Sequence, residues 1–162
     1  MSDKALYVLA GLNEDTQDLL AEYQTALTEK GYIGTQTKNI PYHITLGSFS
    51  TDCENMLAKK LNDYALTNPS VELMYNYIGI FGGGKVLFVC PDATHQLLAL
   101  KEAFNDNRDW TAHTTLLIDE SEIVLDAAKA LLSSFKPFSA KIDSLHLYEF
   151  FPTRHILSVK LK

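Results

Sequence analysis

The chain has 162 residues, of which 46% are hydrophobic and 21% charged, and its formal net charge is −6. This length and composition are typical of one globular domain that buries a core without disulfide or metal staples. The 14 basic residues against 20 acidic ones argue against a protein that grips long nucleic acid through a broad basic face.

Neither a membrane span nor a signal peptide is predicted. No apolar run approaches the roughly 18 to 20 residues that a membrane span needs. The apolar stretch at 5–12 is short and is followed by the polar segment 13–15, which does not fit a signal peptide. Cys53 and Cys90 lie in no Cys-x-x-Cys motif, so reduced thiols are favoured over a disulfide. We therefore expect a cytoplasmic protein with no membrane association.

The first half of the chain predicts the order strand, helix, strand, helix, strand. Apolar residues with a period of two indicate the strands, and apolar residues three and four apart indicate the helices. Asn13 and Asp52 stand where the N-caps of the two helices are expected. The five elements cover residues 4–11, 13–31, 40–49, 52–68 and 71–81.

The second half repeats this order and adds one strand. A hairpin turn at 82–84 leads into it, because a strand follows the glycines and a phosphate loop would need a helix N-terminus there. Asp92 is expected to cap the first helix of this half, and Ser121 opens the second. The six elements cover residues 85–90, 92–104, 112–118, 121–132, 138–151 and 155–161. The matching orders indicate an internal duplication, with lobes at roughly 1–81 and 82–162.

A His-x-Thr motif occurs once in each half, as His43-Ile44-Thr45-Leu46 and His113-Thr114-Thr115-Leu116. Within a strand, the His and the Thr two positions later point to the same face. A single pair of this kind is more often structural than functional, but its recurrence at matching places favours a site. We interpret the chain as an α+β protein in which two mostly antiparallel sheets face a central cleft, with helices on the outside and both motifs in the cleft.

Two imidazoles and two hydroxyls facing one cleft suit the cleavage of a phosphodiester. One proton must leave the attacking oxygen and another must reach the leaving oxygen, and His holds either protonation state near neutral pH. The Thr hydroxyls are short, stiff donors that reach the nonbridging phosphate oxygens. The sequence does not assign the roles of acid and base to His43 and His113 individually.

No metal or other cofactor is expected. Metal binding needs several His, Cys or carboxylate ligands at compatible spacing, whereas His95 lies on a predicted helix and His146 and His155 stand alone on predicted strands. No Gly-x-Ser-x-Gly elbow supports a serine nucleophile.

At these residues the chain resembles the 2H, or two-histidine, phosphoesterase superfamily, in the branch of 2′-5′ RNA ligase-like and cyclic nucleotide phosphodiesterase proteins. Both motifs match the superfamily's pattern of His, hydrophobic, Thr or Ser, hydrophobic. The segment 79–81 before the strand at 86–88 matches its Gly-hydrophobic-Phe segment. The likeness covers nearly the whole chain in the order of elements. Thr114 departs from the usual aliphatic residue, but a β-branched side chain still suits a strand.

The resemblance implies a bilobal duplicated fold and metal-independent action on a 2′,3′-cyclic phosphate or a 2′-5′ phosphodiester. It implies catalytic roles for His43 and His113 and phosphate contacts from Thr45 and Thr115. The low basic content favours a small nucleotide or RNA-end substrate over an extended nucleic-acid surface. A second hypothesis is a non-catalytic nucleotide- or RNA-end-binding module on the same fold, since a fold does not fix a function.

Aromatic and basic residues near the predicted cleft are candidates for substrate contacts. Phe49 and Tyr148 are predicted to contact the substrate, as rings on which a base stacks. Lys38, Lys85 and Arg154 are the basic residues expected near the cleft mouth. With so few of them, we expect the protein to bind one or two nucleotides. Separately, we expect a monomer.

Overall fold

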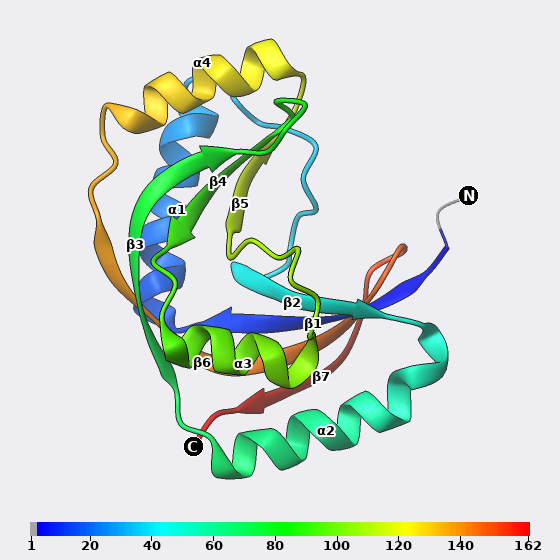
Figure 1. The fold of residues 1–162 in the computed structure, drawn as a ribbon. Helices are drawn as coiled ribbons and strands as arrows, with labels where there is room; N and C mark the ends of the chain where they lie inside the picture. Colours follow the sequence, from blue (N-terminus) through cyan, green and yellow to red (C-terminus); the bar gives the residue numbers. More distant parts are fainter. Residues whose placement is uncertain (1–2) are drawn as a thin grey trace.

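The computed structural model describes residues 3–162, and Met1 and Ser2, which begin the segment predicted not to be a signal peptide, lie outside the described residues. Within 3–162 the chain forms four α-helices and seven strands, so the α+β class is confirmed (Figure 1). The elements are β1 (Ala5–Leu12), α1 (Glu14–Glu29), β2 (His43–Phe49), a 3₁₀ turn (Thr51–Cys53), α2 (Glu54–Thr67), β3 (Val71–Ile80), β4 (Val86–Pro91), α3 (His95–Phe104), β5 (Thr114–Ile118), α4 (Ser121–Leu132), β6 (Phe138–Phe150) and β7 (Arg154–Lys160).

The strands are antiparallel, as predicted, and follow the order β2-β1-β6-β3-β4-β5, with β7 paired to β6. The strands of the two halves are hydrogen-bonded into one continuous, curved sheet rather than two separate sheets (Figure 1). The pairing of β3 with β6 makes this connection. It satisfies the backbone groups that two separate sheets would leave exposed along these strands.

The strand order is symmetric with respect to the predicted repeat. Exchanging β1 with β4, β2 with β5 and β3 with β6 leaves the order of the sheet unchanged. In space, however, β6 lies beside β1 and β3 lies beside β4. Each half therefore places its third strand next to the first strand of the other half. The order is compatible with the duplication, which stays a prediction.

The helix starts agree only in part with the predicted caps. Asn13 caps α1 as predicted, since its side chain accepts a hydrogen bond from the first turn. The caps predicted at Asp52 and Asp92 are wrong, because Ser50 caps the 3₁₀ turn that precedes α2, Cys53 stands at the start of α2 without a side-chain cap, and Thr94 caps α3. Ser, Thr and Asp rank close together as N-caps, so neighbouring candidates are hard to separate from sequence alone.

The glycine segment 82–84 is a hairpin turn, as predicted. It joins the antiparallel strands β3 and β4, and Gly83 and Gly84 adopt φ angles of 92° and 73°. These positive angles are readily adopted by glycine and rarely by other residues. Cys53 and Cys90 are not joined by a disulfide, in agreement with the prediction. None of the helices within 3–162 is long and apolar enough to cross a membrane.

Gly11 on β1 lies beside the first residue of the first motif. It pairs with His43 of β2 on one side and with Ser144 of β6 on the other. A Cβ atom at this position would lie 2.2 Å from Ser144 Oγ and 2.4 Å from His146 Nε2. Only glycine therefore leaves room for these two side chains to lie over β1, next to the first motif.

We predict that Gly11→Ala lowers the free energy of unfolding by about 1–3 kcal/mol, the usual effect of inserting a methyl group into a packed site. Gly82→Ala is the matched control, because nothing lies within 4 Å of its added Cβ. Urea unfolding of both variants measures the difference. Equal stability of the two variants would contradict the close packing over Gly11.

Candidate active site

The two motif histidines are held in the same way. His43 begins β2, and His113 immediately precedes β5. Nδ1 of each ring lies 2.8 Å from the carbonyl oxygen two residues earlier, that of Pro41 or Thr111. A carbonyl oxygen only accepts, so each Nδ1 carries the donated proton. In the neutral rings Nε2 is then the nitrogen that can accept a proton.

Both imidazoles lose proton affinity in this environment. Burial lowers the pKa of His43, and the nearby His113 lowers it further, while the hydrogen bond to Pro41 opposes the shift. Burial likewise lowers the pKa of His113, opposed by its hydrogen bond to Thr111. Because His113 contributes to the lowered pKa of His43, we expect the titrations of the two rings to be coupled.

Two cavities contain the motif side chains, and each combines the His of one motif with the Thr of the other. The first, which we call the loop cavity, has a volume of about 410 Å³ and is lined by His43, Thr115 and the segment 36–42. The second, the tryptophan cavity, has a volume of about 330 Å³ and is lined by His113, Thr45 and Trp110. The site therefore needs residues from both halves of the chain.

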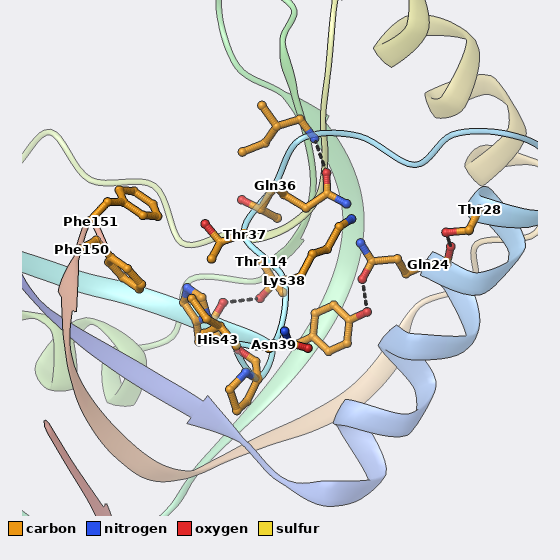
Figure 2. Close-up of a pocket in the computed structure, with 15 residues that line it drawn as sticks. Gln24, Thr28, Gln36, Thr37, Lys38, Asn39, His43, Thr114, Phe150 and Phe151 are labelled. Atoms are coloured by element: carbon orange, nitrogen blue, oxygen red, sulfur yellow. Dashed lines mark hydrogen bonds between the residues drawn. The ribbon is translucent and has the colours of Figure 1, made fainter. Parts of the chain in front are cut away.

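The loop cavity combines amide groups, one cation and aromatic rings. Figure 2 shows His43 between the rings of Phe150 and Phe151 on one side and the side chains of Gln36 and Lys38 on the other. Small-molecule sites commonly pair apolar walls with a few fixed polar groups of this kind. The cavity therefore offers surfaces suited to a base and to a ribose.

The loop that precedes the second motif forms one wall of the tryptophan cavity. Trp110 Nε1 donates a hydrogen bond to the carbonyl oxygen of Thr45 at 2.9 Å. The side-chain amide of Asn105 donates to the carbonyl oxygen of Leu46 at 3.0 Å. These bonds tie the loop to the backbone of β2. The cavity keeps its shape through contacts between the two halves of the chain.

Two phenylalanine rings fix the orientation of the second histidine. The ring centroid of Phe81 lies 4.7 Å from that of His113, with an interplanar angle of 87°. Phe88 packs against the same imidazole at 5.3 Å. Edge-to-face packing of this kind restricts ring rotation. It complements the hydrogen bond that anchors Nδ1 of His113.

The structure does not bring Phe49 to the motifs. A β-bulge lies between the pair Val8–Gly47 and the pair Leu9–Thr45. Since a bulge inserts one residue, it reverses the alternation of faces beyond it. Phe49 therefore shares the face of the buried core strand residues and packs against the core instead of lining either cavity.

Tyr148 lies behind the loop cavity rather than in its wall. Its side chain is buried, and its ring stacks on Phe150 at a centroid distance of 5.7 Å and an angle of 10°. Phe150 is the residue that lines the cavity. Tyr148 thus supports an aromatic wall residue without facing the cavity itself.

Of the three predicted basic residues, Lys38 lies in the wall of the loop cavity. Lys85 pairs with Glu120 at 3.4 Å, and Arg154 pairs with Glu54 and Glu149. Neither of these two lines a cavity that contains a motif residue. Their charges are partly neutralised by the neighbouring carboxylates.

Sequence reasoning missed Trp110 as a wall residue and treated Thr114 as an ordinary strand residue. Thr114 is buried, and its hydroxyl forms hydrogen bonds to Tyr75 and to the backbone of His43. The only sign of this role in the sequence was that Thr114 stands where the superfamily usually has an aliphatic residue. No local pattern marks Trp110, because its partner Thr45 lies 65 residues earlier.

His146 and His155 do not stand alone, which corrects the prediction from sequence. Ser158 Oγ lies 2.6 Å from His146 Nδ1 and 2.7 Å from His155 Nε2, and Ser144 Oγ lies 3.3 Å from His146 Nε2. Burial lowers the pKa of His146 to about 4, with smaller contributions from nearby positive groups, His155 first among them. Across residues 3–162, no three His, Cys, Asp or Glu side chains gather in a way that could hold a metal ion.

Solved structures share this fold over nearly the whole chain. Escherichia coli LigT complexed with 3′-AMP has a TM-score of 0.66 at 17% identity and covers 99% of both chains. A protein described as a phosphoesterase has a TM-score of 0.63 at 17% identity with the same coverage. TT0787 of Thermus thermophilus has a TM-score of 0.65 at 14% identity and covers 97% of both chains. Comparison with protein-family models and with curated proteins gives no match.

The overall α+β fold predicted from the resemblance to the 2H phosphoesterases is therefore confirmed, while its division into two duplicated lobes stays a prediction. Identities of this size establish the arrangement of helices and strands, while the chemistry has to be argued from the site.

We predict that the stability of the fold decreases on acidification between about pH 6.5 and pH 4, partly because of His146. The unfolded chain binds a proton at His146 in this window and the folded chain does not, so lowering the pH favours unfolding. Urea unfolding at a series of pH values should show a shallower dependence for His146→Gln. His95→Gln, an exposed residue of α3, is the control and should keep the parent profile. A parent-like profile for His146→Gln would contradict the assignment.

Proposed function

We propose that this chain is a metal-independent phosphoesterase of the 2H superfamily. Its proposed substrate is a 2′,3′-cyclic phosphate or a 2′-5′ phosphodiester of a nucleotide or short RNA end. The observation that carries the proposal is the matched anchoring of His43 and His113 through Nδ1, which leaves the same nitrogen of each ring available for proton transfer. One ring can serve as general base while the other serves as general acid.

In the proposed reaction the phosphorus lies between the two imidazoles. The Nε2 atom of the basic histidine accepts a proton from the attacking water as the new oxygen–phosphorus bond forms. The protonated Nε2 of the other histidine donates its proton to the ribose oxygen as the old bond breaks. The lowered pKa values favour a neutral ring as the base, and an anionic phosphate between the rings stabilises the protonated ring that serves as acid.

Thr45 and Thr115 are proposed to donate hydrogen bonds to the nonbridging phosphate oxygens. Each lies on the wall of the cavity that contains the histidine of the other motif. We propose that the phosphate lies between the two cavities, within reach of both hydroxyls. Donors held in advance of the reaction stabilise the charge that develops on these oxygens.

The loop cavity is the proposed site of the nucleoside. Asn39 and the donors of Lys38 beyond its bond to the carbonyl oxygen of Ile33 provide hydrogen-bond partners, and Phe150 and Phe151 provide aromatic surface (Figure 2). Small-nucleotide binding is also supported by E. coli LigT, which has been crystallised with 3′-AMP, ATP and phosphate.

We predict that His43→Ala or His113→Ala lowers the turnover of 2′,3′-cyclic nucleotides and 2′-5′ dinucleotides about a hundredfold or more, the usual effect of losing a positioned proton-transfer group. The double replacement should add little, because both groups act in one step. Steady-state kinetics in the presence of a chelator measure these rates. His95→Ala, on the exposed side of α3, is the control and should retain parent activity.

Near-parent turnover by His43→Ala or by His113→Ala would refute the assignment of these histidines as general base and general acid. Tight nucleotide binding by the parent with no turnover of any of these substrates would favour the non-catalytic binding module. A rate that disappears in chelator and returns with a divalent ion would contradict metal independence.

We predict that a cyclic mononucleotide and a longer RNA with the same end bind with similar affinity. Each additional phosphate contact would release counterions and steepen the salt dependence of binding, and the chain has 14 basic against 20 acidic residues. Equilibrium binding at several salt concentrations measures both affinity and slope. Affinity that rises steadily with RNA length, with a steeper slope, would reveal an extended RNA-binding surface.

A further inference from the structure

A buried chain of hydrogen bonds links the two motif strands. The hydroxyl of Thr114 donates to the carbonyl oxygen of His43 at 3.0 Å, as the dashed line in Figure 2 marks. The same hydroxyl lies 2.7 Å from the phenol oxygen of Tyr75. A threonine hydroxyl has one proton to donate, so Tyr75 must be the donor to Thr114. The chain therefore runs from Tyr75 through Thr114 to His43.

The two side chains that form this series of hydrogen bonds, Tyr75 and Thr114, are protected from water. Tyr75 on β3 is 0% exposed, and Thr114 is 1% exposed. The Tyr75 ring stacks on Phe138 at 5.1 Å and 11°. Burial raises the pKa of Tyr75, so its phenol keeps the proton that it donates. Hydrogen bonds in such a dry environment are stronger than exposed ones and define a fixed geometry.

No strand ladder fixes the distance between the two motifs. β2 and β5 stand at opposite ends of the strand order and are not paired with each other. Thr114 directly follows His113, so one peptide unit, one short side chain and one hydrogen bond connect His113 to the backbone of His43. The ties from Trp110 and Asn105 reach β2 further along, at Thr45 and Leu46.

We propose that Tyr75 and Thr114 are positioning residues that set the separation of His43 and His113. The inference rests on the proposed function. The link is one-sided, because Ile44 occupies the position of Thr114 in the first motif and has no hydroxyl. Tyr75 acts through Thr114, and neither residue takes part in proton transfer.

The expected effect of losing the link lies in kcat rather than in KM. Proton transfer at two sites depends steeply on distance, and small displacements of reacting groups cost large factors in rate. Thr114 also lines the loop cavity, but its hydroxyl is engaged with Tyr75 and with the carbonyl oxygen of His43, so the nucleoside contacts proposed for the segment 36–42 do not use it. Ground-state binding should therefore change little when the two strands move relative to each other.

Thr114→Val, which keeps the shape and removes the hydroxyl, should lower kcat about tenfold or more and change KM less than threefold. Thr114→Ser, which keeps the hydroxyl, should retain kcat within about threefold of the parent. Tyr75→Phe should have an intermediate effect, since the bond to His43 remains. Tyr23→Phe is the matched control and should keep parent kcat, because it removes a phenol that accepts a hydrogen bond from Lys136 away from both cavities.

The double variant Tyr75→Phe/Thr114→Val separates positioning from stability. Thr114→Val alone leaves a buried phenol without a partner, which destabilises the fold, and Tyr75→Phe removes that phenol. Stability should therefore recover in the double variant while kcat stays low. Recovery of kcat together with stability would overturn the proposal, as would parent kcat in folded Thr114→Val or a Thr114→Ser variant as slow as Thr114→Val.

A second measurement does not depend on turnover. NMR titration of the two imidazoles should show a changed pKa for His43 in Thr114→Val, because both the burial of His43 and the effect of His113 on it depend on how the two strands are held. An unchanged His43 titration would overturn the proposal. If the parent shows no turnover, the proposed function fails, and this titration still tests the link. If the parent turns over and the variants match it in both measurements, the link fails and the function stands.

Discussion

The arrangement of the site depends on how two unpaired strand edges are held together. β2 and β5 carry the motifs, yet no backbone ladder joins them. Side chains bridge the gap instead, each donating to a carbonyl oxygen of β2. The donors are Thr114, Trp110 and Asn105. A ladder would bring the strands to about 5 Å and fill the space between them. Side-chain links keep the edges aligned and leave room for the cavities beside His43 and His113.

The crosswise composition of the cavities follows from this arrangement. The loop cavity takes His43 from one motif and Thr115 from the other, and the tryptophan cavity takes His113 and Thr45. Neither half of the chain alone provides both the His and the Thr of one cavity. The continuous sheet, joined by β3 and β6, provides the rigid frame on which the two incomplete sets meet. A site built on paired strands is positioned more accurately than one built on loops alone.

The sequence predicted what depends on local periodicity and missed what depends on distant partners. The motif strands, and with them His43 and His113, were located because a period of two is visible in a short window. Phe49 was misjudged because plain alternation does not reveal a bulge, which depends on the pairing of β1 with β2. Thr114 was compatible with any strand. Its role became visible only through Tyr75, which lies 39 residues earlier, and His43, which lies 71 residues earlier.

The matched anchoring of the two histidines has a consequence for the direction of the proposed reaction. Both rings fix Nδ1 on a carbonyl oxygen two residues earlier, so moving one proton from one ring to the other exchanges their roles without moving any heavy atom. By microscopic reversibility, the forward and reverse reactions then use the same atoms with the proton on opposite sides. Such a site has no built-in preference for breaking or making the bond. The supply of water and of the competing ribose hydroxyl would set the direction.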